Sequence, residues 1–171
     1  SANVTISRVN GSLTDHYDPR SNTLRLSDSV YGSDSVAAVG VAAHECGHAL
    51  QEHDGYGLLK LRSALVPVVN IGSSLYLPIF MAGLLFSWEP LQMAGILCFG
   101  LTLLFSLVTL PVEINASKRA LGMLDGVLEA EELQGAKAVL SAAALTYLAS
   151  VISSALQLLR LILISRSRNR D

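Results

Sequence analysis

Long apolar windows without a charged residue dominate the chain after residue 62. They lie between Arg62 and Glu89, between Glu89 and Glu113, and between Lys137 and Arg160. Each is longer than the roughly 20 residues that a helix needs to cross the hydrocarbon core of a bilayer. Their polar residues are mostly Ser, Thr, Gly and Pro, which membrane helices tolerate. Helices buried in a soluble core would need a larger protein around them, so we predict three transmembrane helices.

The same pattern divides the chain into four parts. We expect an N-terminal part at 1–62, a transmembrane hairpin at 63–110, a polar helical segment at 111–138, and a last span with a basic tail at 139–171. Pro111 stands near the expected start of the helical segment, where its missing N–H is not needed. Because the chain begins with a strand-like stretch and no Met, we also expect a preceding piece with room for another membrane anchor.

Alternating apolar and polar residues near the N-terminus indicate short β-strands. The alternation covers 4–9 and 23–27, and 13–17 is a candidate third strand. A helix without an interrupting proline is expected at about 34–52, with four candidate N-caps upstream: Asp28, Ser29, Ser33 and Asp34. The predicted fold is mainly α, with a small N-terminal β-sheet and three transmembrane helices.

The expected helix carries the sequence His44-Glu45-Cys46-Gly47-His48. Two histidines four residues apart project from one face of a helix, about one turn apart, and can bind one zinc ion. Glu45 is then free to act as a base on a zinc-bound water. The alternative interpretation is a pair of helix histidines near a membrane surface, but the helix-forming flanks favour the zinc motif.

A catalytic zinc site needs a third protein ligand and a fourth position that is open to water. Glu52, His53 and Asp54 follow His48 too closely to reach the metal unless the helix breaks or distorts. Glu113 is separated from the motif by two expected spans, so a membrane hairpin returns it to the same side. We therefore predict three zinc ligands and one catalytic base: His44, His48 and Glu113, with Glu45.

The composition of the chain favours a membrane protein and argues against a nucleic-acid-binding protein. The chain has 51% hydrophobic and 15% charged residues and a net charge of -2, with a mean hydropathy of +0.46. Such values favour a lipid bilayer as the surroundings of the chain. No long basic run is present, which argues against nucleic acid as a partner. Cys46 and Cys98 form no disulfide framework and are expected to be packing residues, Cys46 on the helix side away from the histidines.

The order of these motifs resembles a known family. His-Glu-x-x-His at 44–48, a transmembrane hairpin, and Glu-x-x-Ala-Ser-x-x-Ala at 113–120 are similar to the YugP-type membrane zinc peptidases of bacteria. The stretches 13–20 and 24–27 also resemble this type, and the HtpX-type and CAAX prenyl proteases are more distantly similar. The resemblance implies a zincin-like active-site helix, zinc, the same ligands and base, an N-terminal membrane helix, and a multi-pass protein of the bacterial plasma membrane.

Two residues depart from the wider pattern of these relatives. Ser117 stands where relatives have an acidic residue that can orient a zinc-bound histidine. Asn115 stands where many YugP-type sequences have Asp. Both are therefore candidates for supporting the ligands rather than for binding the metal.

The expected activity is that of a membrane-embedded zinc metalloendopeptidase. Zinc lowers the pKa of a bound water, and Glu45 takes its proton during attack on a peptide carbonyl. In related proteases the strand before the motif helix lines the cleft, so His16 and Tyr17 are candidate oxyanion donors. His16 equally fits a surface turn beside Asp15 and Asp18. Such a strand can also pair with an extended polypeptide substrate, with little sequence specificity.

Two other function classes stay open. A non-catalytic zinc-binding membrane adaptor is disfavoured because structural zinc sites are usually closed, whereas this one has a base and an open position. A protease that cuts inside the bilayer needs its motif in a full span, and the run bracketed by Asp34 and Glu52 is too short to cross. We expect an active site at the membrane surface, with polypeptide and lipid bilayer as partners. The sequence indicates neither the substrate nor the oligomeric state.

Basic residues near the spans give conflicting signals about orientation. Arginines of the tail favour a cytoplasmic C-terminus, yet an odd number of spans sends the tail to the face opposite the active site. The basic residues near the active site flank two spans rather than one, so we give them more weight and predict a cytoplasmic active site. They are Lys60, Arg62, Lys118, Arg119 and Lys137, against Arg166, Arg168 and Arg170 in the tail.

Overall fold

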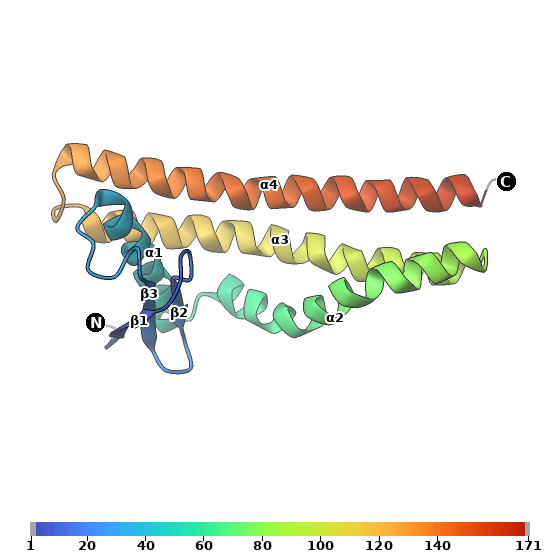
Figure 1. Ribbon diagram of the computed structural model, residues 1–171, viewed down its shortest axis with the longest axis horizontal. Helices are drawn as coiled ribbons and strands as arrows, with labels where there is room; N and C mark the ends of the chain where they lie inside the picture. Colours follow the sequence, from blue (N-terminus) through green and yellow to red (C-terminus); the bar gives the residue numbers. More distant parts are fainter. Residues whose placement is uncertain (1–2, 170–171) are drawn as a thin grey trace. The chain divides into compact units, whose positions relative to one another are not determined.

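The computed structural model describes residues 3–169, and within that range it contains four helices and three short strands (Figure 1). The strands are β1 (Thr5–Val9), β2 (His16–Asp18) and β3 (Thr23–Ser27). The helices are α1 (Val36–His53), α2 (Gly57–Leu85), α3 (Glu89–Leu124) and α4 (Ala130–Arg168). The prediction of a mainly α fold with a small N-terminal sheet is confirmed.

Three of the helices have the properties that the apolar windows predicted. By length and composition, α2, α3 and α4 are each able to cross a membrane. Many of their large apolar side chains face outward; Ile71 is 61% exposed and Leu97 is 66% exposed. An apolar surface of this kind is unfavourable in water and is stable in hydrocarbon.

The segment 111–138 is not a helix of its own, and Pro111 does not open one. Helix α3 continues from Glu89 to Leu124 with Pro111 in its interior, and α4 begins at Ala130. A proline inside a long apolar helix is tolerated because neighbouring groups compensate for its single missing N–H. The chain turns later, at Gly126, whose φ of 82° lies in the left-handed region that favours glycine.

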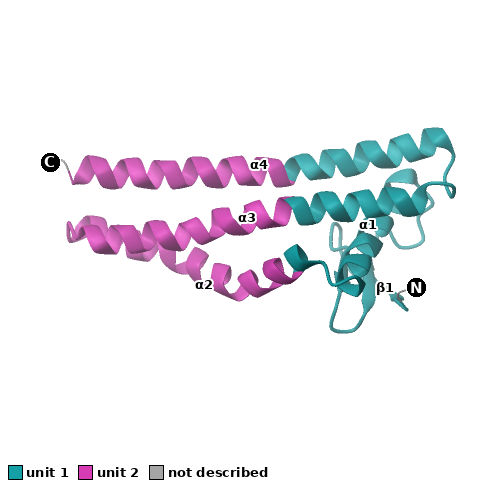
Figure 2. Ribbon diagram, turned by 180° about the vertical axis from the view of Figure 1, so that it is seen from behind, with its two compact units in different colours: residues 1–59, 111–146 teal, residues 60–110, 147–171 magenta. Residues whose placement is uncertain are grey.

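The chain divides into two compact units (Figure 2). The first unit comprises residues 1–59 and 111–146 and holds the sheet, α1, the end of α3 and the beginning of α4. The second unit comprises residues 60–110 and 147–171 and holds most of α2, the beginning of α3 and the end of α4. Helices α3 and α4 therefore each contribute one part to either unit.

In the first unit β3 is the central strand of a sheet with the order β1-β3-β2. Strand β1 pairs with β3 in parallel, and β2 pairs with it antiparallel, Tyr17 lying opposite Leu24. Leu24 is 3% exposed, so the central strand contributes to the core. The third strand lies at 16–18 rather than at 13–17, because Leu13 has a φ of 58° and cannot continue an extended strand.

Helix α1 begins one or two residues later than predicted. Its N-cap is Ser35, which is none of the four residues expected. Ser35 has an extended backbone, and its hydroxyl accepts a hydrogen bond from the N–H of Ala38 at 3.2 Å. This contact satisfies one of the backbone donors that the first turn of a helix leaves unpaired.

Small residues bring α1 and α3 into close contact in the first unit. A Cβ atom added to Gly47 would lie 2.4 Å from the backbone oxygen of Ala116. The two helix backbones can therefore approach this closely only because position 47 has no side chain. A cluster of buried apolar side chains lies alongside this contact: Ala43, Ala120, Leu124, Ala136 and Leu140.

The second unit has a core of its own, which includes one buried polar side chain. Gln92 is completely buried; its amide donates to the backbone oxygen of Gly83 at 3.1 Å and its side-chain oxygen accepts from the Ser165 hydroxyl at 2.6 Å. Gln92 is therefore buried with its hydrogen bonds formed. The apolar core between the parts of α2, α3 and α4 in this unit consists of Phe80, Ile96, Phe99 and Leu161.

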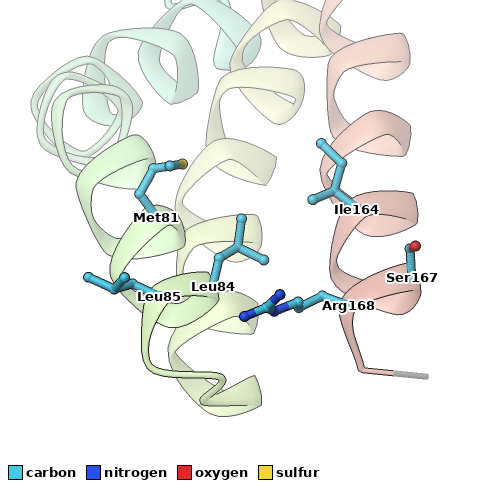
Figure 3. A pocket seen from close by; sticks show the side chains of 6 residues that line it. All are labelled: Met81, Leu84, Leu85, Ile164, Ser167 and Arg168. Carbon is cyan, nitrogen blue, oxygen red and sulfur yellow. The ribbon is translucent and has the colours of Figure 1, made fainter. Parts of the chain in front are cut away.

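A cavity of about 500 Å³ also lies in the second unit (Figure 3). Its wall is mostly apolar, and neither the predicted zinc ligands nor the predicted base line it. The chemistry that the sequence indicates therefore belongs to the first unit. The residues that line the cavity are Met81, Leu84, Leu85, Ile164, Ser167 and Arg168.

We predict that Gly47→Ala destabilises the protein, because the new methyl group would collide with the Ala116 backbone rather than with a flexible side chain. Overpacking of this kind typically costs about 1–3 kcal/mol. The midpoint of thermal unfolding in detergent, followed by circular dichroism, measures the effect. Gly122→Ala is the matched control: it lies in α3 with nothing within 4 Å of its added Cβ. Its better helix propensity should keep stability equal or raise it, and equal midpoints for both variants would contradict the prediction.

Candidate metal centre

Three side chains converge between α1 and α3 in the first unit. Nε2 of His44 lies 2.9 Å from Oε2 of Glu113, and Nε2 of His48 lies 3.3 Å from the same oxygen. The ligand atoms of the three residues all lie within 4.8 Å of one another. Two atoms bound to one tetrahedral zinc ion at about 2.1 Å lie about 3.4 Å apart. The spacing of the three atoms therefore fits a single metal ion.

The local geometry of α1 explains this convergence. His44 and His48 are neighbours one turn apart, with ring centroids separated by 4.8 Å and ring planes at 89°. Only 3% of the Glu113 side chain is exposed, and the two imidazoles are 14% and 12% exposed. A carboxylate buried this deeply is costly unless positive charge compensates it. Two nitrogens and one oxygen are also a donor set that zinc prefers, so these residues fit the metal.

Each histidine has a hydrogen-bond partner at its other ring nitrogen. Nδ1 of His44 lies 3.0 Å from the hydroxyl oxygen of Ser117, on α3. Nδ1 of His48 lies 2.9 Å from Oε1 of Gln51, on α1. Histidines that bind metals commonly have such outer partners, which hold the ring in one orientation. The contact that relatives are expected to make with an acidic residue is made in this chain by Ser117.

Asn115 lies one step further from the histidines. Its Oδ1 accepts a hydrogen bond from Nε2 of Gln51 at 2.9 Å and another from Nε of Arg119 at 2.9 Å. The contact of Gln51 with His48 was not predicted from the sequence. The available signal was spacing, since a residue three positions after His48 lies on the same helix face.

Glu45 lies beside the three converging side chains. Burial raises the pKa of the Glu45 carboxyl above its ordinary value, and the charge of Glu113 acts in the same direction. The two histidines and a hydrogen bond from the backbone N–H of Tyr17 act against this rise. A carboxyl group with a raised pKa exchanges its proton closer to neutral pH, as a general base and acid must.

The electrostatics of His48 favour a positive charge. Burial alone lowers its pKa, but the hydrogen bond to Glu113 and the charges of Glu113 and Glu45 outweigh burial and raise the pKa of His48. The surroundings of the ring therefore stabilise a cation at this point. This is the property required of a site for a metal ion.

The two candidate oxyanion donors lie in different surroundings. The backbone N–H of Tyr17 donates to Glu45, whereas its hydroxyl donates to Oδ1 of Asn22 at 2.8 Å. His16 is exposed, and its Nδ1–H donates to the backbone oxygen of Thr14 at 2.8 Å. Tyr17 therefore reaches the expected base through its backbone, while His16 occupies a surface position.

The other titratable residues near the motif are not part of the converging group. Among the described residues the group that could hold a metal contains neither Glu52 nor Asp54. Asp54 instead pairs with His53 at 3.1 Å and with Arg119. Cys46 is partly buried, and burial raises the pKa of its thiol, as expected for a packing residue.

Comparisons with known proteins indicate the family of the chain. Residues 2–166 match the family described as "Putative neutral zinc metallopeptidase". The chain is also 45% identical over 163 residues to "Putative membrane protease YugP" of Bacillus subtilis (strain 168), a match that covers 94% of this chain and 72% of that protein. No solved structure matches the chain significantly. The match to the family spans nearly the whole chain, which therefore belongs to this family of zinc metallopeptidases.

Proposed function

We propose that the chain is a membrane-embedded zinc metalloendopeptidase that hydrolyses peptide bonds with water as the nucleophile. The observation that carries the proposal is the convergence of His44, His48 and Glu113, with Glu45 buried beside them. The family match and the name of the Bacillus relative support the same activity.

In this proposal Glu45 moves the proton. Zinc held by the three side chains would supply a Lewis acid that lowers the pKa of water and polarises the peptide carbonyl. Glu45 accepts the proton that water loses as it attacks the carbonyl carbon, and then donates it to the departing amine. The raised pKa of Glu45 favours the protonated form that the second transfer needs. Contacts with Ser117 and Gln51 keep the two imidazoles oriented meanwhile.

The sheet offers a place for an extended polypeptide. Strand β2 is at one edge of the sheet, and it pairs with β3 on its other side. Strand β2 also contacts α1, the helix that carries Glu45, so this strand lies beside the proposed base. A peptide that adds to the edge would bind mainly through its backbone, which favours broad sequence specificity.

The two alternative functions fit the described residues less well. A zinc-binding adaptor has no need of a buried carboxyl beside its ligands, and Glu45 is 9% exposed. A protease that cuts within the bilayer needs its motif in a spanning helix, but α1 is not among the three described helices able to cross a membrane. We therefore place the proposed active site at a membrane surface.

We predict that Glu113→Ala weakens zinc binding by more than the roughly 10–100-fold typical of removing an outer partner. The reason is that a buried oxygen ligand is lost from a group of three. Zinc content after equilibration with a competing chelator measures the effect. Glu52→Ala and Asp54→Ala are the controls and should bind zinc like the unchanged protein. A Glu113→Ala variant that keeps its full affinity would reject Glu113 as a ligand.

We predict that Glu45→Gln lowers peptide hydrolysis by at least about 10²–10⁴-fold, the usual contribution of a general base. Zinc content and the thermal unfolding midpoint should stay close to those of the unchanged protein, because the variant keeps the size of the side chain and all three ligands. A fluorogenic peptide assay beside zinc analysis checks both parts. Loss of zinc in this variant, or near-normal turnover, contradicts the assignment.

We further propose that the chain is a multi-pass protein of a bacterial plasma membrane with its active site on the cytoplasmic face. The bacterial relative and the three apolar helices support the location. The orientation rests on the basic residues near the proposed site, which flank two spans.

The orientation predicts which positions are accessible from outside intact cells. In a background with Cys46 and Cys98 replaced by alanine, Glu89→Cys should react with a membrane-impermeant thiol reagent, and Ser63→Cys should be protected. The positions flank the first expected span at opposite ends. Permeabilised cells, in which both variants should react, are the control. Labelling of Ser63→Cys from outside with Glu89→Cys protected would reverse the orientation.

A further inference from the structure

Gln51 is completely buried, and both the nitrogen and the oxygen of its side-chain amide have hydrogen-bond partners. Nε2 donates to the backbone oxygen of Val112 at 2.8 Å and to Oδ1 of Asn115 at 2.9 Å. These two bonds use both hydrogens of the amide. The remaining atom, Oε1, lies 2.9 Å from Nδ1 of His48.

The partners allow only one orientation of this amide. The backbone oxygen of Val112 can only accept, so the nitrogen of Gln51 must face it. If the amide were reversed, Oε1 would face two acceptor oxygens and no hydrogen would lie between them. Arg119 strengthens the argument, because its guanidinium can only donate and its bond at 2.9 Å identifies the facing atom of Asn115 as Oδ1.

The orientation of Gln51 determines which nitrogen of His48 carries the hydrogen. Oε1 can only accept, so Nδ1 of His48 must be the donor. Nε2 of His48, which faces the Glu113 carboxylate at 3.3 Å, is then the nitrogen left to bind a metal, and without metal it donates to that carboxylate. His44 differs, because its partner Ser117 has a hydroxyl that can donate or accept.

We propose that Gln51 is a positioning residue that holds His48 in the Nδ1–H form, with Nε2 directed at the metal, and that Asn115 and Arg119 hold Gln51 in turn. The proposal rests on the proposed zinc site. It assigns a role to a residue that touches neither metal nor substrate and acts only through His48. Asp54 pairs with Arg119 at the exposed surface, where such pairs contribute little, so the positioning role does not extend to Asp54.

Two consequences separate this role from ordinary packing. Without Gln51 the hydrogen of the His48 ring can lie on either nitrogen, and the ring can rotate. Only a fraction of the protein then has Nε2 ready to bind zinc, which lowers the apparent affinity. The affinity for zinc should therefore fall by about 10–100-fold, as for other outer partners of metal-binding histidines. The second consequence concerns the metal-free protein, in which Nδ1 of His48 should already carry a hydrogen.

The test compares two completely buried glutamines of the chain. Gln51→Leu removes the partner of His48, and Gln92→Leu removes an equally buried network in the second unit. Gln51→Glu keeps an oxygen that can accept from Nδ1. Two quantities are measured for each variant in detergent: zinc affinity by chelator competition, and the ring ¹⁵N shifts of the histidines. The chain has 4 histidines, so the spectra can be assigned by single replacements.

We expect the unchanged protein without metal to show a hydrogen on Nδ1 of His48, whether or not Glu113 keeps a second one on Nε2. Gln51→Leu should show a mixture of forms and bind zinc about 10–100-fold more weakly, Gln51→Glu should recover part of both, and Gln92→Leu should change neither. Unchanged zinc affinity in Gln51→Leu, or an equal loss in Gln92→Leu, would overturn the proposal. If Gln51→Leu fails to fold, a His48 ring that carries no hydrogen on Nδ1 in the unchanged protein overturns it alone.

Failure of the proposed function would look different. A chain that binds no zinc in any variant contradicts the zinc site, while the ¹⁵N shifts still report the form of His48. A chain that binds zinc but is indifferent to Gln51 contradicts only the positioning role.

Discussion

The close contact between α1 and α3 at Gly47 and Ala116 is the constraint on which the proposed site depends. Only a residue without a side chain allows the two backbones to meet there. Gly47 lies between the two histidines in sequence, and Ala116 lies between Glu113 and Ser117. The contact therefore sets the distance and the register between both pairs. A wider spacing of the helices would separate the ring nitrogens from the carboxylate oxygen.

Each helix then contributes groups with the same spacing. His44 and His48 lie four residues apart on α1, as Glu113 and Ser117 do on α3, so each pair spans about one turn. This match lets a histidine interact with both members of the opposite pair, His44 with Glu113 through Nε2 and with Ser117 through Nδ1. The arrangement of the candidate metal-binding atoms and of their hydrogen-bond partners thus follows from two features. The two helices have the same number of residues per turn, and they are in close contact at one point.

The sequence predicted the features that depend on local pattern. Charge-free windows indicated three apolar helices, and the spacing of His44 and His48 predicted that their side chains share a helix face. The expected membrane hairpin predicted that Glu113 lies on the same side as the two histidines, and in the structure Glu113 contacts both of them. The features that were missed depend on tertiary contacts: Gln51 became informative only once Asn115 and Val112 were beside it. The prediction that a helix begins near Pro111 was wrong, because proline interrupts a helix more strictly in water than among apolar neighbours.

The separation of the three proposed ligands along the chain has a thermodynamic consequence. His44 and Glu113 are 69 residues apart and stand on different helices. An ion bound by both would act as a reversible cross-link that closes a long loop of the polypeptide, much as a disulfide does. Because the unfolded chain cannot present such a site, binding would favour the folded state by mass action, and resistance to unfolding would become a function of the free metal concentration. If the ion is the proposed zinc, a cell that limits its free zinc would limit the stability of this protein as well as the proposed activity.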